Sequence, residues 1–182
     1  MRFFLDFDGV IFDTQALKEK MASLGIAEGE RSEETLRLVE ERDPSFSLRE
    51  LVFSDAAAFL DANHGHCDII SSYVSTNPDA RADAADACAY QALKIRLSGV
   101  TGLLGEERVH VVGERKREML SELARICAAE EEDCIFVDDR LAHIEEARLL
   151  GIRALLMDRT GAFEHVPERI RSFAELAEPH HV

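Results

Sequence analysis

Two pairs of acidic residues, far apart in the sequence, each follow a short apolar run. Asp6 and Asp8 come after the apolar residues near the N-terminus, and Asp138 and Asp139 follow the apolar residues 134–137. An apolar run of this length is most easily interpreted as a buried strand. A pair of carboxylates at the end of such a strand is costly unless a cation or a reaction requires them. The two pairs therefore predict one shared site for a hard divalent metal ion.

The composition fits one globular domain with a single sizeable core. The chain has 182 residues, of which 46% are hydrophobic and 31% are charged. Its formal net charge of −15 disfavours nucleic acid or an anionic membrane surface as a partner, because both would repel an acidic protein. An anionic substrate would need a metal ion or local positive charge in order to bind.

Cysteine usage and the N-terminal residues predict a cytoplasmic protein. The cysteines show no CxxC spacing, so we expect reduced structural thiols rather than a zinc site or disulfides. They are Cys67, Cys88, Cys127 and Cys134. Only three apolar residues separate Arg2 from Asp6, which is too few for a signal peptide. No segment approaches the ~20 apolar residues of a membrane-spanning helix.

Short apolar runs alternate with longer amphipathic segments along most of the chain. The predicted strands are residues 2–6, 68–75, 108–112, 134–137 and 152–157. The predicted helices are residues 78–97, 116–129, 141–150 and a short one around 170–176. This alternation predicts an α/β fold, a Rossmann-like parallel sheet with helices on both faces. Both faces would be covered, since the strands are almost continuously apolar.

Residues 15–53 interrupt this alternation. They contain helical patterns at 15–24, 32–42 and 47–53 and no convincing strand. Ser47 and Glu50 have the spacing of a helix capping box. We therefore expect a small helical insertion at 15–53, and an α/β core formed by residues 1–14 and 54–182.

The segment that begins at Asp6 resembles the first motif of the haloacid dehalogenase-like superfamily of phosphohydrolases. That motif is Asp-x-Asp-Gly-Thr/Val, a hydrophobic residue and often Asp-Ser/Thr, at the end of the first strand. Here it corresponds to Asp-Phe-Asp-Gly-Val-Ile-Phe-Asp-Thr, residues 6–14. The resemblance continues in order to about residue 157. It implies that the insertion is a small helical cap.

Three further motifs of the superfamily have counterparts in this sequence. The second is a Ser or Thr after the second strand, where Thr76-Asn77 fits best and Ser75 or Ser72 are alternatives. The third is a basic residue before a helix, for which we choose Lys116. The flanking residues Arg115 and Arg117 are alternatives. The fourth is the acidic pair Asp138-Asp139.

The resemblance implies a role for each of these carboxylates. Asp6 would attack phosphorus and form an aspartyl-phosphate. Asp8 would protonate the leaving oxygen and then accept a proton from the hydrolytic water. Mg²⁺ would be held by Asp6, the backbone carbonyl of Asp8 and Asp139, with Asp138 beside it.

The resemblance also implies which residues would bind the substrate phosphate. Thr76, Asn77 and Lys116 would hold the phosphoryl oxygens, so that the charge of the transition state meets donors already in place. Gly9 would let the backbone pass close to the phosphate.

Several residues also have an ordinary structural interpretation. Asp-x-Asp-Gly alone could belong to a turn or a calcium loop, but an EF-hand places its glycine at the sixth position rather than the fourth. Asp138 and Asp139 could cap a helix, as could Thr76. Asp13 could cap the first helix of the insertion. We expect His143 to be an exposed helix histidine.

The leading functional hypothesis is a Mg²⁺-dependent phosphatase that acts on a small phosphomonoester, as a monomer or homodimer. A phosphomutase of the same superfamily is the alternative, although a small insertion would exclude water poorly. Dehalogenase chemistry does not need the acid at Asp8. The third alternative is a non-catalytic protein that binds phosphate ligands and retains the fold.

Overall fold

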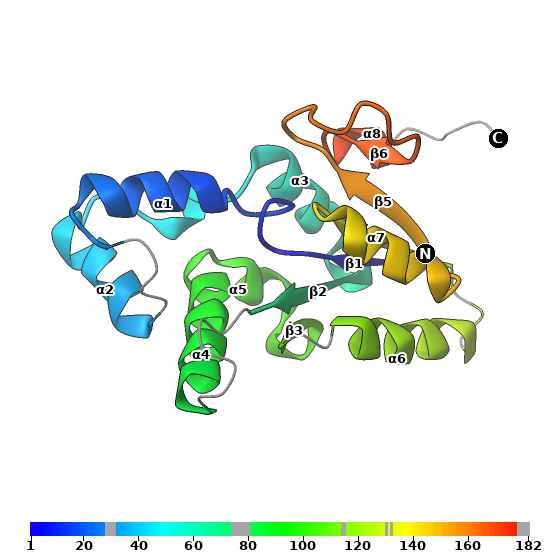
Figure 1. The fold of residues 1–182 in the computed structure, drawn as a ribbon, viewed down its shortest axis with the longest axis horizontal. Helices are drawn as coiled ribbons and strands as arrows, with labels where there is room; N and C mark the ends of the chain where they lie inside the picture. The colour runs from blue at the N-terminus through cyan, green and yellow to red at the C-terminus, as the bar shows by residue number, and fades with distance from the viewer. Residues whose placement is uncertain (28–31, 74–80, 114–115, 130, 132, 178–182) are drawn as a thin grey trace.

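A computed structural model describes residues 1–27, 32–73, 81–113, 116–129, 131 and 133–177. A single six-stranded sheet forms its centre (Figure 1), with the strand order β3-β2-β1-β4-β5-β6 and every neighbouring pair parallel. The strands are β1 Arg2–Leu5, β2 Cys67–Ser72, β3 Val109–Val112, β4 Cys134–Asp138, β5 Arg153–Met157 and β6 Arg169–Ile170. The predicted α/β fold with a parallel sheet is confirmed.

Helices cover both faces of the sheet, as its apolar strands require. The core of one face includes residues of α3 Ser54–Asn63, α4 Arg81–Leu97 and α5 Val100–Leu104. The core of the other face includes residues of α6 Lys116–Ala129 and α7 Leu141–Leu149. Successive side chains of a strand point to opposite faces of the sheet, since Ile69 belongs to the first core and Ile70 to the second.

The segment between β1 and α3 is helical. It holds α1 Thr14–Ser23, α2 Glu33–Arg42 and the 3₁₀ helix η1 Leu48–Leu51. The Asp13 carboxylate accepts a hydrogen bond from the N–H of Ala16 and so caps α1, as predicted. The predicted capping box is also present in η1.

The segment leaves the core and returns to it at one place. An antiparallel bridge joins Phe12 to Val52. The backbone N–H of Asp13 donates to the carbonyl of Leu51, and that of Phe53 donates to the carbonyl of Ile11. The division of the chain into a core and a separate cap remains a prediction.

One predicted element is wrong. We expected a helix around residues 170–176, but residues 169–170 form β6 at the sheet edge and α8 spans only Ala174–Ala177. The Asp158 carboxylate accepts backbone hydrogen bonds from Ala162 and Phe163. These contacts hold the turn that brings β6 alongside β5.

Candidate functional site

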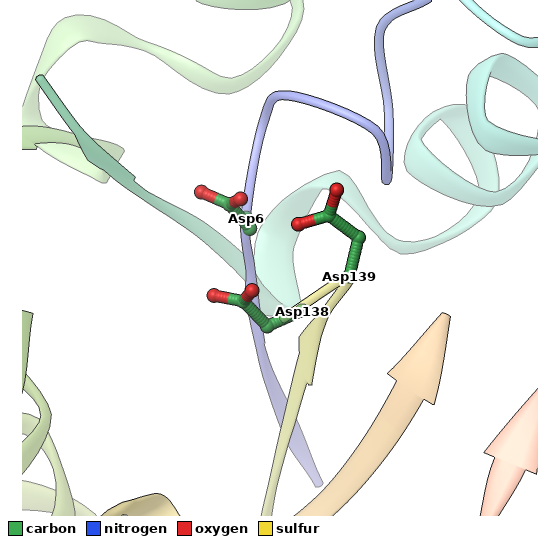
Figure 2. A group of neighbouring side chains, drawn as sticks. All are labelled: Asp6, Asp138 and Asp139. Carbon is green, nitrogen blue, oxygen red and sulfur yellow. The ribbon is translucent and has the colours of Figure 1, made fainter. Parts of the chain in front are cut away.

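Three carboxylates meet at the carboxyl end of the two central strands. Leu5 of β1 pairs with Val137 of β4, and the N–H of Asp6 donates to the Val137 carbonyl at 2.9 Å. This register places Asp6 beside the acidic pair that ends β4 (Figure 2). One ligand oxygen from each of Asp6, Asp138 and Asp139 lies within 4.8 Å of those of the other two. The predicted convergence of the two motifs is therefore present in the structure.

The surroundings of Asp6 and Asp139 disfavour the charged forms of these two carboxylates. Burial raises the pKa of Asp6 to about 7, and the charges of Asp138 and Asp8 contribute in the same direction against the opposing charge of Lys116. Burial also raises the pKa of Asp139 to about 6, together with the charge of Asp138. Negative charge is thus concentrated at the ends of β1 and β4 in excess of the nearby positive charge.

Lys116 is the basic residue that reaches this cluster. It is the first residue of α6, and its buried ammonium donates to Oδ1 of Asp6 and to Oδ2 of Asp138, both at 2.7 Å. Burial alone would lower the pKa of Lys116, but the two carboxylates raise it overall. Of the two alternatives, Arg117 is exposed and Arg115 lies outside the described residues.

The donor set fits a divalent cation such as Mg²⁺. Three carboxylates against one ammonium leave a formal charge of −2, and carboxylate oxygens are the ligands that hard cations prefer. Such a cation would neutralise the charge that Lys116 leaves uncompensated. Asp6, Asp138 and Asp139 are the residues that could hold it.

Gly9 makes room for one of these carboxylates. Its φ is +75°, and a Cβ built on it would lie 2.3 Å from Oδ2 of Asp139. A side chain at position 9 would therefore be strained and would displace Asp139. The predicted approach of Gly9 to a phosphate remains a prediction.

Asp8 is not one of the three clustered carboxylates, and donors surround its own carboxylate. Lys94 donates to its Oδ1 at 2.6 Å, Gln91 donates to its Oδ2 at 2.7 Å, and the Thr14 hydroxyl also donates to Oδ1. Burial would raise the pKa of Asp8, but the charge of Lys94 and these hydrogen bonds lower it overall. Asp8 is therefore held as a carboxylate in this conformation. Metal binding by its backbone carbonyl remains a prediction.

Sequence reasoning did not identify Gln91 and Lys94. Both are buried in α4, and the amide of Gln91 also donates to the hydroxyl of Ser71 at 2.7 Å. A weak signal was available, since Lys94 stands between the apolar residues Leu93 and Ile95 and one turn after Gln91. A lysine in such a place is seldom buried without a partner.

The expectation for His143 is wrong. Its side chain is only 19% exposed, and its Nδ1 lies 2.9 Å from Oδ2 of Asp138. The N–H of Arg140 donates to the other oxygen of Asp138 at 2.8 Å. Burial would raise the pKa of Asp138, but His143 and Lys116 lower it overall. Asp138 is thus oriented by three neighbours, as suits a residue placed beside a metal ion.

The two residues of the second motif cannot be placed. Thr76 and Asn77 lie outside the described residues, as does Ser75. The remaining alternative, Ser72, ends β2 and lines a cavity of about 660 Å³. This cavity extends from Asp8 between α1 and α4. Figure 1 shows these two helices beyond the carboxyl end of β2.

Solved structures share this architecture over almost the whole chain. A haloacid dehalogenase-like hydrolase from Burkholderia xenovorans has a TM-score of 0.61 at 17% identity, covering 98% of this chain and 95% of its own. The HAD-hydrolase YfnB from Bacillus subtilis, solved bound to magnesium, has a TM-score of 0.52 at 16% identity, covering 96% of both chains. The UTR4 protein of Saccharomyces cerevisiae has a TM-score of 0.51 at 13% identity, covering 96% and 98%.

This chain has the fold of the haloacid dehalogenase-like hydrolases. No protein-family model and no curated protein matches its sequence. Within the described residues, none of the helices has the length and apolar character needed to cross a membrane. The haloacid dehalogenase-like fold includes both hydrolases and a dehalogenase among its solved structures, so the choice of reaction depends on the site itself.

Proposed function

We propose that this protein is a Mg²⁺-dependent phosphatase that hydrolyses a small phosphomonoester through an aspartyl-phosphate. The convergence of Asp6, Asp138 and Asp139 beside the ammonium of Lys116 carries this proposal. A carboxylate nucleophile and an anionic phosphoryl group repel each other, so the reaction needs positive charge at the point of attack. When bound, the metal ion would supply that charge by polarising the phosphoryl oxygens.

Asp6 is the proposed nucleophile. Its position at the end of β1 is fixed by its backbone bond to Val137, and its side chain is oriented by Lys116. A carboxylate oxygen of Asp6 attacks phosphorus while the bond from phosphorus to the leaving oxygen breaks. Lys116 carries positive charge beside the attacking oxygen and would stabilise the charge that develops on the phosphoryl group.

Asp8 is the proposed proton carrier, lying two residues beyond the nucleophile. It gives a proton to the leaving oxygen and later takes one from the water that attacks phosphorus, which breaks the acyl-phosphate bond and restores Asp6. The carboxylate form stabilised by Lys94, Gln91 and Thr14 suits the second of these steps. Thr14 is the first residue of α1, so Asp8 is contacted at the point where the core leads into the proposed helical cap.

Dehalogenase chemistry is the competing reaction on this fold. It displaces halide by carboxylate attack and requires neither a metal cluster nor an acid at position 8. The acidic cluster and the network around Asp8 therefore favour phosphoryl transfer. A phosphomutase would need its site shielded from water, which the short segment between Asp13 and Val52 provides poorly.

Hydrolysis of p-nitrophenyl phosphate, together with a panel of phosphomonoesters, tests the proposal. We expect turnover in Mg²⁺ that EDTA abolishes and that Asp6→Asn lowers at least 10³-fold. Arg125→Gln is the matched control, because its exposed pair with Glu122 lies on α6 away from the cluster. Halide release from a 2-haloacid, or the absence of turnover on the whole panel, would contradict the phosphatase assignment.

A further inference from the structure

The cavity beside Asp8 lies where a leaving group would be. Asp8 would give its proton to the leaving oxygen, so the space that starts at its carboxylate receives the rest of the substrate. α1 contributes Lys18 and Met21 to its walls, α4 contributes Tyr90 and Lys94, and the turn after β4 contributes Arg140. The cavity is therefore shared between the helical segment that follows β1 and the sheet with its own helices.

The charges around this cavity favour an anionic occupant. Asp8 is neutralised by its ion pair with the buried ammonium of Lys94 at 2.6 Å. Lys18 and Arg140 also line the cavity, and the charge of Arg140 also acts on the neighbouring Asp139. The remaining acid is Glu19, which accepts a hydrogen bond from the amide of Gln15. Among the side chains that line the cavity, positive charge thus exceeds negative charge, although the chain as a whole carries −15.

Lys18 and Arg140 reach the cavity from two different elements of the fold. Lys18 projects from α1, while Arg140 immediately follows Asp139 and so stands next to the acidic cluster. Arginine binds carboxylate and phosphate oxygens through a planar pair of donors, and lysine adds a point charge. An anionic group bound by both would connect α1 to the turn after β4.

We propose that the cavity selects phosphomonoesters whose leaving group carries a second anionic group, bound by Lys18 and Arg140. This inference rests on the proposed phosphatase function and adds the class of substrate. Either a carboxylate or a second phosphate could supply this second anionic group. The Lys94–Asp8 pair at the inner end of the cavity prevents Asp8 from repelling such a group.

A series of three-carbon phosphates separates these possibilities. The probes are 3-hydroxypropyl phosphate with a neutral end, 3-phosphonooxypropanoate with a carboxylate, and propane-1,3-diyl bisphosphate with a second phosphate. We expect kcat/KM in Mg²⁺ to be about tenfold or more higher for at least one anionic probe than for the neutral one, as one charge-assisted contact gives. Whichever anionic probe has the larger advantage identifies the group that the cavity prefers.

Two variants assign that preference to the named residues. Lys18→Met and Arg140→Met should each reduce the ratio of anionic to neutral kcat/KM roughly fivefold to tenfold. Arg37→Met is the matched control, because it also removes an exposed cation from the segment between β1 and α3 but does not line the cavity. Its ratio should equal that of the unmodified protein.

The failures of the two proposals are distinguishable. Equal kcat/KM on all three probes, or equal loss on all three in Lys18→Met and Arg140→Met, would overturn the anion subsite and leave the phosphatase intact. Absence of hydrolysis on every probe and on p-nitrophenyl phosphate would overturn the phosphatase and the subsite with it. Thermal unfolding of each variant within a few degrees of the unmodified protein shows that the fold is retained.

Discussion

Replacing Asp139 with asparagine tests whether the charged form of this carboxylate destabilises the fold in the absence of a metal ion. The pKa of Asp139 is raised to about 6 from 3.8, chiefly by burial and then by the charge of Asp138. The folded protein therefore holds a proton at this position more tightly than the unfolded chain. Its free energy of unfolding must fall as the pH rises from about 4 to about 6, and the loss persists above that range.

The size of the effect follows from the pKa difference. A difference of about 2 pH units corresponds to about 3 kcal/mol at 1.36 kcal/mol per unit. Asp139 is only partly buried, so water screens part of this energy, and we expect Asp139→Asn to gain about 1–3 kcal/mol at pH 8. For a chain of this size, the gain corresponds to a rise in Tm of roughly 3–9 °C.

Thermal unfolding followed by circular dichroism measures this directly. In EDTA, Asp139→Asn should have a higher Tm than the unmodified protein at pH 8 and an equal Tm near pH 4. Excess Mg²⁺ should raise the Tm of the unmodified protein and leave that of the variant almost unchanged, because ligand binding stabilises the folded state. A lower Tm for the variant at pH 8, or an equal response of both proteins to Mg²⁺, would refute the reasoning.

Three further predictions concern the residues around the cluster. Lys94→Met should lower the free energy of unfolding by about 1–3 kcal/mol, because it leaves the partly exposed Asp8 carboxylate without its cation. In chemical denaturation the double variant with Asp8→Asn should lose clearly less than the sum of the two single losses, and strict additivity would contradict the pairing. Gly9→Ala should lower the Tm and weaken Mg²⁺ binding in calorimetry, because its Cβ would overlap the carboxylate of Asp139, a proposed metal ligand, at a positive φ. Unchanged Mg²⁺ affinity would show that the position tolerates a side chain. His143→Ala should weaken Mg²⁺ binding by about tenfold, because it removes a neighbour that orients Asp138. His143→Gln should restore part of the affinity. Equal Mg²⁺ affinities in the unmodified protein and both variants would assign His143 a purely structural role.

The features of the fold that depend on local patterns were predictable from the sequence. The strands β1, β4 and β5 are predominantly apolar runs, and α6 spans the residues that its amphipathic pattern predicted. β6 was not predictable, because two residues form a strand only when the turn held by Asp158 brings them beside β5. α3 was not predicted from the sequence either, and its N-cap residue makes no side-chain hydrogen bond that would have marked its start.

The candidate site was predictable only where a motif marks it. The first and fourth motifs carry the three clustered carboxylates, and the third carries Lys116. The network around Asp8 was not predictable, because Gln91 and Lys94 belong to an alanine-rich helix and acquire their role from the way α4 packs against the end of β2. His143 likewise requires the turn after β4 to be known.

The covalent intermediate is the most direct test of the central claim that Asp6 attacks phosphorus with the aid of a divalent cation. In a rapid acid quench of a single turnover with ³²P-labelled phosphomonoester, we expect label on the protein in Mg²⁺ and none in EDTA. Reduction of the acyl-phosphate with borohydride, followed by peptide mass spectrometry, should identify Asp6 as the residue that carried the phosphoryl group. Turnover without a labelled protein, or label at a residue other than Asp6, would contradict the proposed mechanism.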